Sequence, residues 1–394
     1  MSSLGQTVTF FLISDLHAFS PADGRPDEPS FLDISLSDTD FNANPFAAVN
    51  RLVATEALTA DYLICCGDFG DRAHPTAIKF AWDHVIDLAS KLKTKHIIAT
   101  VGNHDLDSRF HYNDYDARGF LQSLSPSFPH TQDDDNDRFW SRHFTVFEHD
   151  NVRIVNLNTS AYHGYSQEHQ YGRISKYTLQ RLQKCLATLQ PKPLNVLVCH
   201  HNPQKQSELG LGDSDDTKNG QLLLDLIGGG CFGDWIVFHG HKHCPKLTYA
   251  SGGANAPIVF SVGSFSCCLY PELYTQVRNQ CYLVEIDLSE VKKFGLVGRF
   301  WAWDWAKGAG WRPAGNDSGL PAHGGFGCRW GVSILANKIQ EHVNMRASWS
   351  ELQTAIPELK YILPADFDAL RSRLSSKFSI SPAGSGCPEE IERI

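Results

Sequence analysis

The feature that most constrains this chain is a short apolar segment, residues 61–66, that ends abruptly in Gly67-Asp68 and is followed by a second acid, Asp71. The segment is too apolar to alternate between polar and apolar positions, which is typical of a strand buried on both faces. Open α/β sheets bind their ligands at the carboxyl ends of such strands. Asp68 therefore lies where a ligand site is expected, and we take it as the candidate centre of that site.

Four more apolar runs end in the same way, in a residue that can bind a metal ion. These runs are residues 8–14, 96–101, 196–199 and 235–239. With Asp68, the residues that follow them form one candidate ligand set: Asp15, His17, Asp68, Asn103, His200, His241 and His243. Each residue alone has an ordinary explanation, such as a turn or a hydrogen-bonded core position. For the set, however, the ordinary explanation would have to be true at all seven positions at once, so a shared ligand site is the better interpretation. Carboxylate, amide and imidazole donors suit two divalent cations such as Mn²⁺, Fe²⁺ or Zn²⁺.

Two cations can share one cluster only if a bridging group offsets their repulsion. A carboxylate does this at a metal separation of roughly 3.5–4 Å, and Asp68 is best placed to be that bridge. A water or hydroxide between the cations would have its pKa lowered toward neutrality and would be held in line with a bound phosphorus atom. We therefore expect hydroxide, and no side chain, to be the nucleophile of a hydrolytic reaction.

The order of the remaining elements predicts an α/β fold with a later antiparallel part. Helices expected over residues 46–57 and 75–92 connect the first three strands into a β-α-β-α-β unit, which should be parallel with right-handed crossovers. Ser175 is expected to cap a helix that ends before Pro191. Later strands near residues 258–262, 281–286 and 294–305 are separated by short turns, which indicates antiparallel pairing.

Other segments have weaker signals. The long loop of residues 18–45 should line a site or contact a partner, because compact domains seldom keep such loops without a use. Residues 106–145, which include an acidic run, read as a solvated loop or a short cap. Residues 307–330 read as Gly-rich and irregular, and residues 352–374 as helical. We expect two parts, residues 1–306 and a C-terminal extension, residues 307–394, of unknown role.

Three tryptophans alternate along the last expected strand. If the segment is a strand, Trp301, Trp303 and Trp305 face the same way. We expect them to form core for the tail that follows. The alternative is a surface on which a base or a partner stacks.

Charge and cysteine usage limit the partners and the compartment. The net charge of −9 argues against a protein that grips nucleic acid mainly through phosphate contacts. The 11 cysteines lie mostly in apolar runs without a Cys-x-x-Cys pair, which favours reduced thiols in the cytoplasm. The amino terminus lacks a basic region and leads directly into the first strand, so we expect no cleaved signal peptide. No run of about 18 apolar residues predicts a membrane span.

Five motifs appear in order: Asp15-x-His17, Gly67-Asp68-x-x-Asp71, Gly102-Asn103-His104-Asp105, His200 and Gly240-His241-x-His243. Together they resemble the calcineurin-like metallophosphoesterase superfamily over about residues 8–300. The resemblance implies a four-layer α/β-β-α sandwich. It implies one metal held by Asp15, His17, Asp68 and His243, and a second held by Asp68, Asn103, His200 and His241.

The resemblance also implies roles for residues that do not hold the metals. His104 is expected to donate a proton to the leaving-group oxygen as an imidazolium oriented by a carboxylate, with Asp71 and Asp105 both open as that carboxylate. Arg72 follows Asp71 as in the protein phosphatases of the superfamily, where such a guanidinium binds phosphate oxygens; the alternative is a surface ion pair. His201 is expected to pack or hydrogen-bond nearby.

The motif details favour one branch of the superfamily. The first motif lacks flanking glycines and the third ends in Asp105, which departs from the protein phosphatases and is nearer the phosphodiesterases and nucleases. We expect a phosphodiesterase for a small phosphodiester such as a cyclic nucleotide, with Asn103 and His104 flanking the phosphate. A nuclease is the alternative, because residues 67–75 are similar to a segment of double-strand-break repair nucleases. A phosphomonoesterase and a non-catalytic scaffold are further alternatives.

Mn²⁺ is the expected cation, with Fe²⁺, Zn²⁺ or Ni²⁺ as alternatives. The sequence does not indicate an oligomeric state.

Overall fold

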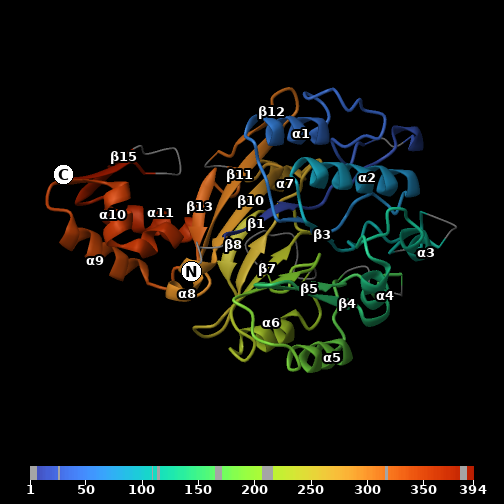
Figure 1. Cartoon of the computed structure of the whole chain (residues 1–394). Helices are drawn as coiled ribbons and strands as arrows, with labels where there is room; N and C mark the ends of the chain where they lie inside the picture. Colours follow the sequence, from blue (N-terminus) through green and yellow to red (C-terminus); the bar gives the residue numbers. More distant parts are fainter. Residues whose placement is uncertain are drawn as a thin grey trace.

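Two β-sheets face each other at the centre of the computed structural model (Figure 1). The structure describes residues 7–24, 27–108, 110–112, 116–164, 171–205, 216–315, 318–381 and 388–394. The first sheet contains β1 (Thr7–Ile13), β2 (Tyr62–Cys65), β3 (His96–Ala99), β10 (Gln280–Asp287), β11 (Gly298–Ala306), β12 (Gly310–Pro313) and β13 (His323–Phe326). The second contains β4 (Phe144–Glu148), β5 (Val152–Leu157), β6 (Leu194–Val198), β7 (Trp235–His239), β8 (Lys246–Tyr249) and β9 (Ile258–Ser261).

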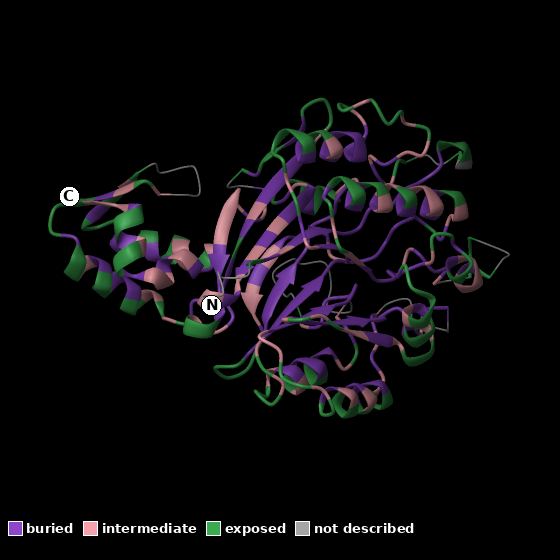
Figure 2. Cartoon of the chain, in the orientation of Figure 1, coloured by how far each residue is buried: buried purple, intermediate pink, exposed green. Residues whose placement is uncertain are grey.

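Helices cover the outer face of each sheet, so the described residues form four layers (Figure 1). Helices α1 (Pro45–Thr55) and α2 (Pro75–Lys91) pack on the first sheet. Helices α5 (Lys176–Leu186) and α6 (Gly220–Gly228) pack on the second. Three apolar cores fill the spaces between the layers, and most strands are buried (Figure 2). The four-layer arrangement expected from the sequence is confirmed.

Strand pairing aligns the strand ends that carry the candidate ligands. Strands β1, β2 and β3 are parallel, and Ile13 lies beside Cys65, which lies beside Ala99. In the second sheet, β5, β6, β7 and β9 are also parallel, with Val198 beside Phe238. Parallel neighbours in register end at the same edge of a sheet. The strand-end residues therefore meet at one edge although they are far apart in the sequence.

The predicted helix starts are also confirmed. Asn44 accepts hydrogen bonds from the backbone N–H groups of Phe46 and Ala47, and Pro45 occupies the first turn of α1. Ser175 caps α5 by accepting from Thr178 N–H. These local signals set the entry points of the crossover helices.

The expectation for residues 106–145 was wrong in part, because they contain α3 (Ala117–Gln122), α4 (Asp133–Arg142) and the first residues of β4. The acidic run forms the first turn of α4, where carboxylates are stabilised by the partial positive charge of the helix N-terminus. Phe139 on this helix is fully buried. The run is therefore part of a packed helix.

The expectation that residues 307–330 are irregular was also wrong. Strands β12 and β13 both pair with β11, so the first sheet continues past residue 306, where we expected the extension to begin. Trp303 and Trp305 are buried with Trp311 in the core beneath α1 and α2, and Trp301 packs against the same core. The tryptophans are core residues, but of the main sandwich and not of the tail.

The C-terminal unit, residues 331–394, has its own core. It contains α9 (Val332–His342), β14 (Arg346–Ser348), α10 (Trp349–Ala355), the 3₁₀ helix η4 (Pro357–Tyr361), α11 (Pro364–Leu374), β15 (Phe378–Ser381) and β16 (Glu390–Arg393). Its strands form a sheet of order β14-β16-β15. Its core joins residues such as Leu335, Leu352, Leu370 and Ile391, all fully buried.

The C-terminal unit docks on the first sheet. Cys328 N–H donates to Tyr361 O across 2.9 Å, and the Tyr361 hydroxyl donates to Glu290 Oε2 across 3.0 Å. Glu290 lies in α8 (Leu288–Phe294), the helix that follows β10. A cavity of 720 Å³ remains between the unit and strands β8, β11 and β13. None of the helices in the described part of the chain is long and apolar enough to cross a membrane.

Candidate metal centre

A first group of donor atoms gathers where β1 and β7 end. His17 Nε2 lies 3.1 Å from His243 Nε2. Asp15 Oδ1 lies 3.4 Å from His243 Nε2 and 3.9 Å from His17 Nε2. Asp68 Oδ2 reaches the same group, 3.6 Å from His17 Nε2. All four side chains are buried.

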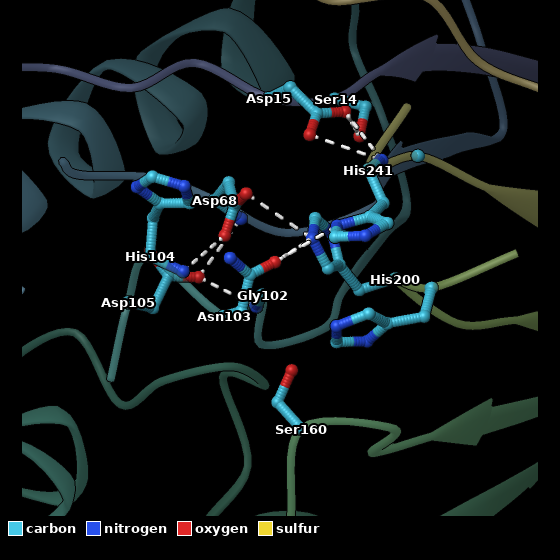
Figure 3. Close-up of polar contacts among 12 residues, drawn as sticks. Ser14, Asp15, Asp68, Gly102, Asn103, His104, Asp105, Ser160, His200 and His241 are labelled. Atoms are coloured by element: carbon cyan, nitrogen blue, oxygen red, sulfur yellow. Dashed lines mark hydrogen bonds and ion pairs between the residues drawn. The ribbon is translucent and has the colours of Figure 1, made fainter. Parts of the chain in front are cut away.

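A second group of donor atoms also includes Asp68, with Asn103, His200 and His241 (Figure 3). His200 Nε2 is 3.2 Å from Asp68 Oδ2 and 3.1 Å from Asn103 Oδ1. Asn103 Oδ1 is also 3.0 Å from His241 Nδ1. One oxygen atom, Asp68 Oδ2, therefore belongs to both groups.

These separations fit metal coordination. Two nitrogen or oxygen atoms bound to the same cation at about 2.1 Å lie roughly 3.0–3.5 Å apart, depending on geometry. Most of the donor pairs above fall within or close to that range. The ring of His200 is also oriented for it, because its Nδ1 lies 2.7 Å from Cys66 O, which leaves Nε2 with its lone pair directed at the cluster. The donors thus fit two cations that share Asp68.

The backbone at this centre is held in an unfavourable conformation. Five of the seven candidate ligands have positive φ, which non-glycine residues seldom adopt: Asp15, His17, Asp68, His241 and His243. Each such residue costs on the order of 1–3 kcal/mol and persists only where the surroundings enforce it. The enforcing contacts include the Asp15 side chain, which accepts from His241 N–H across 3.1 Å.

Asp71 and Asp105 have different neighbours. Asp71 Oδ1 lies 2.9 Å from His104 Nδ1, so it is Asp71 that orients this imidazole. The Asp105 carboxylate instead accepts the N–H groups of Asp68, Phe69, Gly70 and Gly102, at 2.6–3.2 Å. Asp105 therefore holds the loop that presents Asp68.

The imidazole of His104 faces the candidate metal centre. Its ring centroid lies 4.6 Å from that of His17, and its side chain is 40% exposed. Desolvation acts to lower the pKa of His104, but the carboxylates of Asp68 and Asp71 outweigh it and raise the pKa above its ordinary value. This shift favours the protonated form of His104.

A cavity of 490 Å³ opens over the centre. Its walls include His17, Asn103, His104 and His243, together with Asp27–Pro29 of the long loop that we expected to line a site. Arg72 lies at this cavity, with its guanidinium 4.9 Å from the ring of Tyr112 and its Nε 3.8 Å from Asp71 Oδ2. The guanidinium can therefore reach a molecule in the cavity.

Sequence reasoning missed several residues at the centre. Cys267 was noted only as a buried thiol, yet its sulfur lies within 4.8 Å of the ligand atoms of His17 and His243. Its place just beyond β9, another strand of the second sheet, was the signal that could have found it. Tyr112 and Tyr270 line the cavity from loops, where no sequence signal marks them. His201, in contrast, packs as expected, with Nδ1 2.9 Å from Thr159 Oγ1.

The chain belongs to the calcineurin-like phosphoesterase family, whose model matches residues 8–245. This family consists of metal-dependent hydrolases of phosphoesters, and the resemblance inferred from the five motifs is confirmed. A second family model, wHTH-Calcineurin_assc, matches residues 324–376. No curated protein matches the chain in sequence.

Solved structures with a similar arrangement share little sequence with this chain. A purple acid phosphatase, PPD1, from yellow lupin (Lupinus luteus) seeds has 13% identity and a TM-score of 0.46, covering 77% of this chain and 52% of that one. PhoD has 9% identity and a TM-score of 0.49, covering 83% and 70%. A 5′-nucleotidase from Candida albicans has 14% identity and a TM-score of 0.37, covering 73% and 48%. The chain thus spans about half the length of the lupin protein.

Proposed function

We propose that this chain is a two-metal phosphodiesterase that acts on a small phosphodiester such as a cyclic nucleotide. The observation that carries the proposal is the sharing of Asp68 Oδ2 between two groups of donor atoms beneath a cavity of 490 Å³. Asp15, His17, Asp68 and His243 would hold the first cation. Asp68, Asn103, His200 and His241 would hold the second. Mn²⁺ is the proposed cation, with Fe²⁺, Zn²⁺ and Ni²⁺ as alternatives.

When bound, the two cations would offset the charge of a phosphate group and lower the pKa of a water molecule between them, which supplies the nucleophile. The side chains are proposed to bind the phosphate and to protonate the leaving group. Asn103, His104 and Arg72 line the cavity, where Asn103 and His104 would flank a bound phosphate and Arg72 would contact its oxygens. As an imidazolium, His104 would donate Nδ1–H to Asp71 and pass its Nε2 proton to the leaving-group oxygen.

The charge of the cavity supports a diester over a monoester. Among the described lining residues, Arg72 contributes the one Lys or Arg side chain, whereas Asp27, Glu28 and Asp71 contribute three carboxylates. A phosphate monoester carries about two negative charges at neutral pH and a diester carries one, so this lining favours the diester. It also disfavours the nuclease alternative, because a cleft for nucleic acid needs several cations along its length.

A substrate panel tests the proposal. The Mn²⁺-loaded protein should be assayed on cyclic nucleotides, an aryl phosphodiester, an aryl phosphomonoester and single-stranded DNA. We expect kcat/KM to be highest for a small diester. A higher value for the monoester or for DNA would overturn the diester proposal, and inactivity on all four with two cations bound would favour a scaffold.

We also propose a cytoplasmic location. No disulfide bond joins any of the ten cysteines in the described part of the chain. Reduced thiols persist in the cytoplasm, whereas oxidising compartments tend to pair them. Fractionation of cells that produce the protein would test this.

A further inference from the structure

Three donor atoms meet beside the first proposed cation position, and one of them belongs to no assigned ligand. The Cys267 sulfur lies within 4.8 Å of the nearest ring nitrogens of both His17 and His243. All three side chains are more than nine-tenths buried. The two imidazole nitrogens already approach each other to 3.1 Å, as donors to a common ion do.

The loop that carries Cys267 is fixed to the loop that carries Asp15 and His17. Ser264 Oγ donates to Asp15 O across 2.7 Å and accepts from Cys267 N–H across 2.8 Å. Ser266 Oγ donates to Leu16 O across 2.6 Å. These hydroxyl groups are fully buried, so they lock the two loops together and fix the sulfur relative to His17.

The thiol has little else to bind. Apart from its contact with His243, the thiol donates a weak hydrogen bond to Cys268 O across 3.6 Å. Cys267 also lines the 490 Å³ cavity, as His17 and His243 do. Packing alone would not require a sulfur atom at this position, beside the ring nitrogens of His17 and His243.

We propose that Cys267 supplies a sulfur ligand to the first cation, in addition to Asp15, His17, Asp68 and His243. This inference rests on the proposed two-metal function. A thiolate favours Zn²⁺, Fe²⁺ or Co²⁺ over Mn²⁺ and Mg²⁺, so Cys267 would shift the first position toward the softer cations. The two positions would then differ in preference, because the second has only nitrogen and oxygen donors.

Spectroscopy of the metal-loaded chain tests this without reference to activity. The wild type, Cys267→Ser and the matched control Cys268→Ser would each be loaded with Co²⁺ and with Zn²⁺, and bound metal would be counted. We expect a sulfur-to-cobalt charge-transfer band in the wild type and in Cys268→Ser, and its loss in Cys267→Ser. X-ray absorption of the Zn²⁺ form should show sulfur at about 2.3 Å in the wild type.

The outcomes separate the two proposals. Two bound cations without a sulfur signal in the wild type would overturn the role of Cys267 and leave the two-metal function standing. Persistence of the band in Cys267→Ser would do the same. A wild-type chain that binds no cation would overturn both. The wild-type X-ray absorption decides the matter even if Cys267→Ser does not fold.

Discussion

At the scale of single residues, Asp68 has the largest share of the proposed chemistry. Its Oδ2 faces both donor groups, while its Oδ1 accepts the N–H of His104 across 2.7 Å. The same side chain therefore joins the two proposed cation positions and fixes the backbone of the proposed proton donor. His104 depends on it, but the reverse does not hold, because neither donor group includes the His104 imidazole.

This asymmetry predicts different effects for two substitutions. Asp68→Ala should abolish metal binding and activity together, because it removes the shared oxygen. His104→Ala should keep two bound cations and lower kcat by about 10²–10⁴-fold, the usual contribution of a general acid. Metal counting and steady-state kinetics on both variants check this. Equal loss of metal in both would show that His104 is a ligand.

The place of Arg72 at the cavity leads to a prediction about substrate binding. Arg72→Ala should raise KM and leave kcat nearly unchanged, because Arg72 lines the cavity and is proposed to bind the phosphate oxygens. Arg51→Ala is the matched control, since Arg51 lies over Phe41 and not at this cavity. An unchanged KM would return Arg72 to the role of a surface ion pair.

The raised pKa of His200 leads to a prediction about how metal binding depends on pH. Burial alone would lower the pKa of His200, but the charge and the hydrogen bond of Asp68 outweigh burial and raise it to about 9. Below that pH the imidazole of the metal-free chain carries a proton, which a cation must displace. Metal affinity should therefore rise as pH rises toward 9, with proton release on binding. Calorimetric Mn²⁺ titrations in buffers of different ionisation enthalpy measure this, and binding without proton release would contradict it.

At the scale of elements, the loop after β3 packs against the loop after β2 with no room between them. A Cβ added to Gly102 would lie 2.0 Å from Asp68 Oδ1, whereas one added to Gly253 would meet nothing within 4 Å. Glycine at residue 102 thus lets two strand ends approach closely enough to share a ligand site.

We expect Gly102→Ala to lower the free energy of unfolding by about 1–3 kcal/mol and to weaken metal binding, because Asp68 must move. Gly253→Ala should change neither. Denaturant unfolding and metal titration of the two variants test this. Normal metal affinity in Gly102→Ala would mean that the Asp68 carboxylate can shift without loss.

The elements that could be predicted from sequence are those with a local cause. Runs such as residues 62–65 are apolar throughout because both faces are covered, and they were predicted as buried strands. Pro45 and Ser175 marked true helix starts. Strands β12 and β13 were missed because they are short and Gly-rich, and their partner, β11, is supplied by tertiary structure.

The candidate site divides in the same way. Seven ligand candidates could be named because each follows a strand, and the parallel register brings them together. The choice between Asp71 and Asp105 could not be made from sequence, because it depends on where the two carboxylates point after Gly70 and Gly102 have packed. The proximity of Cys267 likewise depends on the serine contacts to residues 15 and 16, which are not local in sequence.

At the scale of the whole molecule, the C-terminal unit is a separate structural body attached to the catalytic layers. Its elements follow in the order α9, β14, α10, η4, α11, β15 and β16, and the second family model matches part of this unit, over residues 324–376. Residues 331–394 contain seven Lys or Arg and eight Asp or Glu side chains. This balance does not favour nucleic-acid binding through phosphate contacts. The unit's own core, distinct from the three cores of the sandwich, suggests that its stability can be changed independently.

Two buried leucines test this independence. Leu370→Ala, in the core of the C-terminal unit, and Leu182→Ala, beneath α5, each remove a fully buried side chain and should each cost about 2–5 kcal/mol. We expect the first to lower the melting temperature of one calorimetric transition and to spare activity on a small substrate. The second should lower the transition that accompanies loss of activity. A single transition shifted equally by both variants would show that the two bodies unfold together.

The left-handed backbone at the five ligand positions affects how this protein could be made more thermally stable. A screen for heat-resistant variants would be drawn to those sites, since glycine or asparagine relieves the backbone there. Glycine would remove a donor atom from the proposed cations, and asparagine would replace a carboxylate or imidazole donor with a neutral amide. Substitutions that raise thermal stability without loss of turnover must therefore lie on surfaces remote from the strand ends. Selection for stability alone should instead favour substitutions at the five ligand positions, which would give well-folded but inactive protein.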